Sequence, residues 1–280
     1  MSTIFTEYLE AKYASGGPDD SRFKDVDGEI HTSEVGRCQR RLWWERRNPQ
    51  ADESSPYFEL GRVLEDVYGA ALGWRHGDLD ESDLNDNKPW GIAPMVPEVE
   101  QDINIEVFIT DDVKIPGEAD WAVYRDDWMD EVREHGGVDE VALATGDVGD
   151  GERRVTWQDG ETTDLAPGEP TPVGTVIETK TIRELALLKG SPKDSHLHQL
   201  WGYMWALNAP GRWDYMVRND LSMASFEQPL DEDLFVDVEL RVRRHRENMR
   251  SDEYPRADPA NKWSCYYCPH KNDCDGALCE

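Results

Sequence analysis

The stretch from Val173 to Lys180, VGTVIETK, decides the fold that the sequence predicts. Its apolar residues are mostly β-branched and begin directly after Pro172, a pattern typical of a buried strand. Glu178 and Lys180 stand at the end of this run. Side chains two residues apart on a strand point to the same face, so we expect this carboxylate and this ammonium to emerge together.

A second carboxylate comes from the chain upstream. Residues 103–109, INIEVFI, alternate as a strand does, and a turn at 111–112 leads into a second strand at 114–124, which we expect to be broken at Pro116–Gly117. This second strand carries Asp120 within the sequence GEAD. The two carboxylates could hold a hard divalent cation, with the lysine ammonium beside it. Metal-assisted phosphodiester hydrolysis requires this combination of groups. A Glu-x-Lys pair alone is more often a solvated ion pair.

The composition is strongly acidic. The chain has 280 residues and a formal net charge of −29. Such an excess of carboxylates is typical of a protein from a high-salt cytoplasm, where salt screens their mutual repulsion; an acidic interaction surface is the alternative. No apolar run approaches the ~20 residues of a membrane span, and the first residues show no signal-peptide core, so we expect a cytoplasmic, halophilic protein without membrane contact.

Helical patterns occupy much of the remaining sequence. The helix that begins at His31 has a hydroxyl available as N-cap and an acid in its first turn. Two helical stretches are basic, at residues 37–47 and 241–250, and we expect them to line the path of a polyanion. A further strand is predicted at 213–218. The predicted helices span residues 4–13, 31–49, 57–71, 183–189, 192–207 and 231–250.

Residues 126–172 differ in character from the rest. They contain fourteen acidic residues against three arginines, with glycine and proline throughout. Strand-like pieces are short, such as 154–157. We interpret the segment as an acidic surface insertion, with hairpins as its form, between the strands that carry Asp120 and Glu178. Solvated decoration is favoured as its role, and a lid over the site is the alternative.

The five cysteines are unevenly distributed. Cys38 lies in the basic helix near the start, and the other four lie in the last sixteen residues, at Cys265, Cys268, Cys274 and Cys279. In a reducing cytoplasm such a cluster is more typical of a metal site than of disulfides. Four thiolates suit structural zinc or an iron–sulfur cluster, and spacing alone favours zinc.

With these pieces in order, the chain resembles the PD-(D/E)XK nuclease superfamily. Within it, the chain is most similar to RecB-like exonucleases with an iron–sulfur cluster, including the CRISPR-associated RecB-like family. The similarity covers residues 31–72, 103–120 and 173–274. It implies an α/β fold with a restriction-endonuclease-like core, a mixed sheet flanked by helices, and a C-terminal iron–sulfur region. A single RecB-like nuclease domain would span 1–280, with the insertion at 126–172 and the cysteine tail at 263–280.

The resemblance also implies a set of site residues. Asp120 matches the motif aspartate, and Glu178 and Lys180 match the Glu-x-Lys pair, with the Thr179 carbonyl as an extra ligand. The family's Gly-x-x-x-His helix corresponds to residues 61–65, where Glu65 replaces the histidine. The implied divalent-metal ligands are therefore Glu65, Asp120 and Glu178, although Glu65 could instead be an ordinary exposed acid.

Two further groups follow from the same resemblance. Gln199 and Tyr203 match a Gln-x-x-x-Tyr pair that faces DNA beside the catalytic residues, and packing is their alternative role. One cysteine from the N-terminal region and three from the C-terminal end match the family's split iron–sulfur ligands, which leaves Cys279 spare. The implied ligands are Cys38, Cys265, Cys268 and Cys274.

The function implied is that of a metal-dependent DNA exonuclease. It would hydrolyse phosphodiester bonds on single strands or DNA ends, in CRISPR adaptation, recombination or repair, with proteins of CRISPR adaptation or recombination as partners. The implied cofactors are Mg²⁺ or Mn²⁺ and a 4Fe–4S cluster. The alternatives are a catalytically silent nuclease-fold subunit that binds DNA ends or a partner, and a zinc-stapled binding protein.

Overall fold

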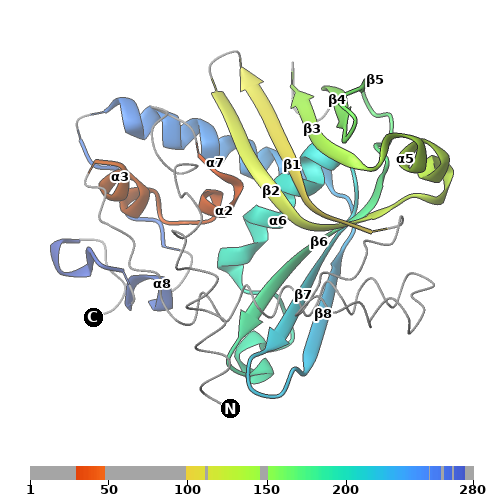
Figure 1. The fold of residues 1–280 in the computed structure, drawn as a ribbon. Coiled ribbons are helices and arrows are strands. Elements are labelled where there is room, and N and C mark those ends of the chain that lie inside the picture. Colours follow the sequence, from red (N-terminus) through yellow and green to blue (C-terminus); the bar gives the residue numbers. More distant parts are fainter. Residues whose placement is uncertain are drawn as a thin grey trace, which may run out of the picture.

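A computed structural model describes residues 30–47, 99–110, 113–145, 151–251, 253–259, 262–266 and 268–274. The helices predicted at 4–13 and 57–71, with Glu65, and the spare Cys279 lie outside the described residues. Within the described ranges, eight strands form one mixed sheet in the order β5-β4-β3-β1-β2-β6-β7-β8 (Figure 1). None of the described helices is long and apolar enough to cross a membrane.

The hairpin predicted at the centre of the sheet is confirmed. β1 (Val99–Thr110) pairs antiparallel with β2 (Val113–Tyr124). On β1, alternate residues from Ile103 to Ile109 are buried while those between them are more exposed, as expected for a strand with one face on the core. The predicted break at Pro116–Gly117 is wrong, because β2 and its pairing with β1 continue through both residues.

Gly117 has a packing role in this strand. A Cβ atom at this position would collide with the side chain of Thr32 and approach Tyr203 Cε1 to 3.1 Å. The absence of a side chain therefore lets two helices approach β2 closely.

The strand predicted from VGTVIETK is also confirmed and runs two residues further than expected. It is β6 (Val173–Ile182), which lies antiparallel to β2 and parallel to β7 (Gly211–Val217). The edge strand β8 (Met223–Gln228) pairs antiparallel with β7 and was not predicted. Its sequence, MASFEQ, has no β-branched residue, so the strand signal is weak.

The described part of residues 126–172 forms hairpins as expected, but the interpretation as solvated decoration is wrong, because these hairpins extend the central sheet. After η3 (Asp126–Trp128) and α5 (Met129–His135), the segment supplies β3 (Val138–Ala144), β4 (Glu152–Trp157) and β5 (Thr162–Leu165) to the sheet. β3 is parallel to β1. The high acid content makes these strands hard to predict from the sequence, because only alternate strand residues are apolar. Those alternate residues are buried: Val141, Leu143, Val155, Trp157 and Leu165.

Arg153 joins these strands to the helical layer. Only 2% of it is exposed, and its guanidinium donates to the carbonyl oxygens of Ala206 at 3.0 Å and Trp205 at 2.9 Å. Burial lowers the pKa of Arg153 to about 10. The carbonyls at the end of a helix carry partial negative charge, so this cation stabilises the helix end that it contacts.

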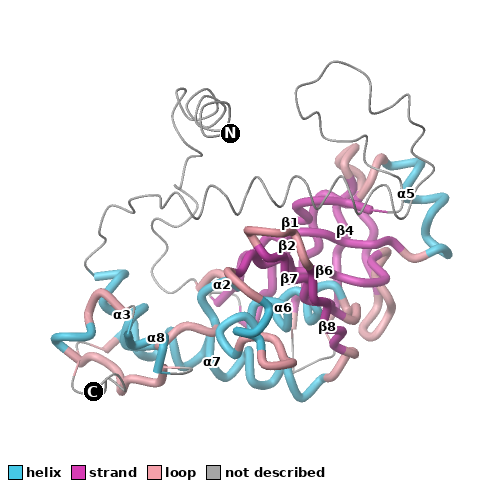
Figure 2. Tube along the Cα trace, turned by 90° about the horizontal axis from the view of Figure 1, so that it is seen from below, coloured by secondary structure: helices cyan, strands magenta, loops and turns pink. Residues whose placement is uncertain are grey.

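The helices that sequence periodicity predicted near residues 192–207 and 231–250 are confirmed. α6 (Asp194–Leu207) lies across the sheet in contact with β1, β2, β3, β6 and β7, and α7 (Glu232–Arg250) packs on α6 on the same side of the sheet (Figure 2). The Trp205 and Phe235 rings stack between these helices with centroids 6.0 Å apart. The helix predicted at 183–189 is reduced to a 3-10 turn, η4 (Leu185–Leu188).

The single helix predicted from His31 onward is broken. The chain forms α2 (Thr32–Val35), leaves the helix at Gly36, and resumes as α3 (Gln39–Arg47). The N-cap is the imidazole of His31, which accepts from the Ser33 backbone N–H at 3.3 Å, in place of the expected hydroxyl. Glu34 completes the cap by accepting from the His31 N–H at 3.1 Å.

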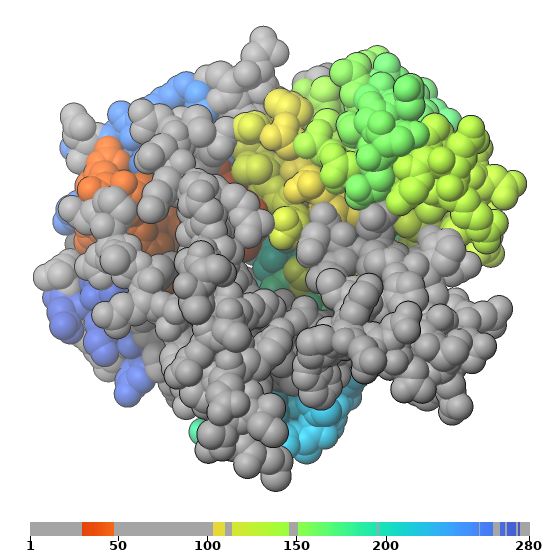
Figure 3. Space-filling model, in the orientation of Figure 1, coloured from red at the N-terminus to blue at the C-terminus, as the bar shows by residue number. Residues whose placement is uncertain are grey.

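The two ends of the molecule differ in what they contain. In the space-filling view, α5 and strands β3 to β5 gather at one end, and α3 gathers at the other with the C-terminal helix α8 (Lys262–Tyr266) and η5 (Lys271–Asp273) (Figure 3). The segments far apart in sequence that carry the cysteines therefore belong to the same region.

A buried histidine where α2, α3 and α7 meet predicts acid sensitivity. His245 is 1% exposed, and neither ring nitrogen has a hydrogen-bond partner among the described residues. Burial lowers its pKa from 6.5 to about 4, so the unfolded chain takes up the proton first as the pH falls below 6.5. Relative to His245→Phe, the wild-type protein should therefore lose on the order of 2–3 kcal/mol of unfolding free energy between pH 6.5 and 4. Denaturant titrations at constant salt measure this, and identical pH dependence in both proteins would contradict it.

Candidate active site

The two predicted carboxylates are brought together by β2 and β6. Trp121 pairs with Ile177, so Asp120 and Glu178 are the next residues along the two neighbouring strands. Asp120 Oδ2 accepts hydrogen bonds from the backbone N–H of Thr179 at 2.7 Å and from its hydroxyl at 2.8 Å. These bonds fix the Asp120 carboxylate directly beside the Glu-x-Lys segment.

Glu178 is the most constrained group of the site. Its side chain is fully buried, and Lys180 Nζ donates to Glu178 Oε1. A buried carboxylate without a compensating charge costs roughly several kcal/mol, so the ammonium offsets this cost. The Lys180 side chain is 25% exposed. The expectation that these two side chains emerge together is met by their ion pair.

Tyr203 and Gln199 stand on α6 next to these carboxylates. Gln199 Nε2 donates to Tyr203 Oη at 2.8 Å, one helical turn apart. Burial raises the pKa of Tyr203 well above its usual value, and the negative charges of Glu178 and Asp120 act in the same direction. The Tyr203 hydroxyl therefore keeps its proton. Tyr203 is buried in this structure and Gln199 is half-buried, and their DNA-facing role stays a prediction.

A set of carboxylates fit for a hard cation is therefore partly in place. Within the described residues, no three His, Cys, Asp or Glu side chains lie close enough together to hold a metal ion. Asp120 and Glu178 supply two carboxylates, and the third predicted ligand, Glu65, lies outside the described ranges. Mg²⁺ is commonly held by one or two carboxylates together with water and substrate phosphates, so the two described acids fit its requirements.

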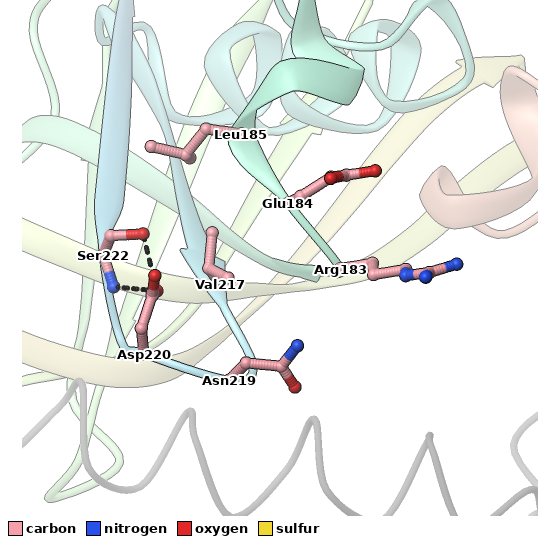
Figure 4. A pocket seen from close by; sticks show the side chains of 7 residues that line it. All are labelled: Arg183, Glu184, Leu185, Val217, Asn219, Asp220 and Ser222. Atoms are coloured by element: carbon pink, nitrogen blue, oxygen red, sulfur yellow. Dashed lines mark hydrogen bonds between the residues drawn. The ribbon is translucent and has the colours of Figure 1, made fainter.

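A surface pocket lies just beyond the end of β6 but is separate from these groups. It is lined by Arg183 and Glu184 after β6 and by residues of the β7–β8 turn (Figure 4). In that turn, the Asp220 carboxylate accepts from the Ser222 N–H at 2.9 Å and hydroxyl at 2.7 Å (Figure 4). The acid of the turn thus serves local structure, and the pocket contains none of the predicted catalytic residues.

Three arginines of the basic helix α3 contact other segments of the chain, and the expectation that this helix lines the path of DNA stays a prediction. Arg40 donates to the Pro255 carbonyl at 2.6 Å, and Arg47 to the Ser251 carbonyl at 2.8 Å. Arg46 is paired with Glu34 at 2.6 Å. These side chains attach α3 to the C-terminal segment and to α2. The exposed arginines of α7 include Arg243, which also pairs with Glu239 at 2.6 Å.

The same contacts bring the four predicted cluster cysteines into one region. Arg40 Nη1 lies 3.6 Å from Cys274 Sγ, and the Gln39 N–H donates to Asp258 at 2.6 Å. The Trp44 and His270 rings are 5.0 Å apart. Cys38 stands at the start of α3, Cys265 is buried in α8, and Cys268 and Cys274 are half-buried around η5.

Burial, more than neighbouring charge, determines the protonation of the thiols in this region. Burial is the main cause that raises the pKa of Cys38 and of Cys268, so both thiols favour the protonated form without a bound cation. No three of the four described cysteines are close enough together to hold a metal in this structure. The four cluster ligands are therefore implied by the resemblance alone. The structure shows that the two segments that carry these cysteines lie against each other.

Sequence reasoning named Thr179 only for its carbonyl and missed both its hydroxyl contact and Tyr215. Strand alternation places Thr179 and Glu178 on opposite faces, so nothing in the sequence indicated that the Thr179 hydroxyl bonds to Asp120. Tyr215 is the register partner of Lys180 on β7. Register between strands joined by a long connection cannot be read from the sequence of either strand.

Comparison with known proteins gives no family assignment. No protein-family model and no curated protein match the chain. The structure is similar to that of SSO0001, with 20% identity, a TM-score of 0.49, and coverage of 99% of this chain and 100% of that one. The alkaline exonuclease LHK-Exo from Laribacter hongkongensis gives 12% identity, a TM-score of 0.44, and coverage of 79% and 88%.

A phage-related exonuclease from Haemophilus somnus gives 10% identity, a TM-score of 0.40, and coverage of 81% of this chain and 95% of that one.

The Thr179 hydroxyl should contribute measurably to stability. Thr179→Val removes the hydroxyl bond to Asp120 and keeps the backbone bond, which should lower the unfolding free energy by about 1–2 kcal/mol, since the acceptor is charged. Thr181→Val is the matched control, because it makes the same change two residues along β6. Denaturant unfolding compares the two variants, and equal losses would contradict the assigned bond.

Proposed function

We propose that this protein is a divalent-metal-dependent deoxyribonuclease of the PD-(D/E)XK superfamily. It hydrolyses phosphodiester bonds as an exonuclease on single strands or DNA ends. The observation that carries the proposal is the meeting of Asp120, Glu178 and Lys180 at adjacent points of β2 and β6, where Thr179 holds one carboxylate and Lys180 the other. These are the three residues that the sequence motif selects.

Each residue has a distinct role in the proposed reaction. Asp120 and Glu178 bind Mg²⁺ or Mn²⁺, with Glu65 as the proposed third ligand and the Thr179 carbonyl as an extra one. When bound, such an ion polarises the scissile phosphate and lowers the pKa of the attacking water. Lys180 orients that water and offsets negative charge that develops on the phosphate.

Residues of α6 support these groups. Gln199 and Tyr203 form a hydrogen-bonded pair beside the carboxylates, which supports the proposal that the pair faces the DNA backbone when substrate is bound. The proposed substrate is DNA, and the proposed setting is CRISPR adaptation, recombination or repair with the proteins of those processes. The charge of −29 supports a high-salt cytoplasm as the working environment.

The site assignment predicts the loss of cleavage in three variants. Asp120→Asn, Glu178→Gln and Lys180→Ala should each reduce cleavage of end-labelled DNA in Mg²⁺ or Mn²⁺ by roughly 10²–10³-fold, because each removes an interaction with the reacting groups. Lys189→Gln, which changes an exposed lysine after η4, should leave the rate unchanged. Wild-type cleavage by Lys180→Ala would show that the site is wrongly assigned.

We also propose that Cys38, Cys265, Cys268 and Cys274 hold one 4Fe–4S cluster. The support is the donor set, four thiols on two segments that pack against each other through Arg40, Gln39 and Trp44. A cluster would link α3 to a segment more than two hundred residues away and thereby stabilise the closed chain.

The cluster proposal has readouts that do not depend on catalysis. Protein purified without oxygen should be brown and contain about four irons per chain, the stoichiometry of this cluster type. Cys38→Ala should give colourless protein with a lower unfolding temperature, whereas Cys279→Ala should match wild type. One zinc per chain without iron would reject the cluster and leave the nuclease assignment intact.

A further inference from the structure

Two side chains beside Lys180, the buried Tyr215 and the half-buried His196, have no role in the site described so far. Tyr215 on β7 is fully buried and pairs with Lys180 in the parallel register of β6 and β7, so the two side chains are neighbours on one face of the sheet. His196 lies in the first turn of α6. Its Nδ1 is 2.9 Å from Tyr215 Oη, and the two rings stack with centroids 5.8 Å apart.

The hydrogen bonds around Tyr215 determine which way its proton points. Tyr215 Oη accepts the backbone N–H of Lys193 at 3.1 Å. The hydroxyl proton is then available to donate to His196 Nδ1, which requires a neutral imidazole with its own proton on Nε2. Burial raises the pKa of Tyr215 to about 12, so its hydroxyl keeps the proton.

The imidazole stays neutral for physical reasons. Burial lowers the pKa of His196 to about 3, and the positive charges of Lys180 and Lys193 act in the same direction. The Trp213 indole N–H also donates to the His196 carbonyl at 3.3 Å, which fixes this turn of α6 to β7. The charged and titratable neighbours are therefore Lys180 and Glu178 from β6, Tyr215 from β7, and Lys193 at the start of α6.

We propose that the hydrogen-bonded Tyr215–His196 pair is a positioning device for Lys180. The pair packs beside the Lys180 side chain and holds the ammonium on Glu178. The pair fills the space next to the ammonium with groups that carry no competing charge. Tyr215 and His196 thus act through Lys180 and do not themselves take part in bond cleavage. This proposal rests on the proposed role of Lys180 and extends it to the residues that keep the lysine in place.

The test measures the lysine itself. An amine-reactive acylating reagent is applied at fixed pH, and the acylation rate of Lys180 is followed by mass spectrometry against exposed Lys189 in the same sample. Tyr215→Phe and His196→Phe should each raise the relative rate by roughly 2- to 10-fold, because loss of the hydrogen bond between Tyr215 and His196, which is worth about this factor, loosens the packing that holds Lys180. His196→Asn retains a polar atom near the Nδ1 position and should restore part of the wild-type rate.

In the double variant Tyr215→Phe with His196→Phe, the relative acylation rate of Lys180 should be close to that of either single variant, because both substitutions remove the same hydrogen bond. Unchanged labelling of Lys180 in Tyr215→Phe would overturn the proposal. His198→Phe is the matched control, since His198 also lies on α6 but its Nε2 is 2.6 Å from the Asp237 carboxylate on α7. An equal rise in this control would reveal general loosening of α6 and would overturn the proposal as well.

Labelling does not depend on cleavage, so the two proposals fail separately. Wild-type protein without metal-dependent nuclease activity, but with the expected change in labelling, would reject the nuclease and retain the positioning pair. In an active enzyme, Tyr215→Phe should lower kcat with little change in DNA affinity. A variant that weakens DNA binding and leaves kcat unchanged would contradict positioning.

Discussion

The fully buried carboxylate of Glu178 is the constraint on which the site depends. A carboxylate with no exposed surface must be compensated by a cation, and in this structure Lys180 provides that charge from two residues along the same strand. The strand period of two makes this pairing possible, and the neighbouring strand adds Asp120, held by two hydrogen bonds from Thr179. Charge compensation and register together place three reactive groups at one point of the sheet.

Helix α6 connects this point to the rest of the molecule. Its first turn is fixed to β7 by Trp213 and Tyr215, its middle brings Tyr203 to the carboxylates, and its last carbonyls accept from Arg153 on β4. Gly117 permits close approach on β2 because a side chain there would collide with Thr32. The strands between residues 138 and 165 therefore support the helix that carries the supporting residues of the site.

Sequence reasoning located the strands of the site because apolar β-branched runs and alternation report burial directly. It missed β3 and β5 and misread residues 126–172, since exposed acids dominate the composition while the buried residues occupy only alternate positions. The role of His31 as the N-cap of α2 was not predicted, because an imidazole rarely takes the place of a hydroxyl at an N-cap. Contacts such as Thr179 with Asp120 and Tyr215 with His196 depend on register and helix docking, which no local pattern encodes.

The central claim is that Asp120 and Glu178 form a divalent-cation site. Direct titration of the purified protein with Mn²⁺, followed by the loss of the free-ion paramagnetic resonance signal, tests it without reference to cleavage. The account predicts that wild-type protein binds about one or two ions and that Asp120→Asn and Glu178→Gln each weaken binding at least tenfold. Mn²⁺ binding that is identical in wild-type and both variants would contradict it.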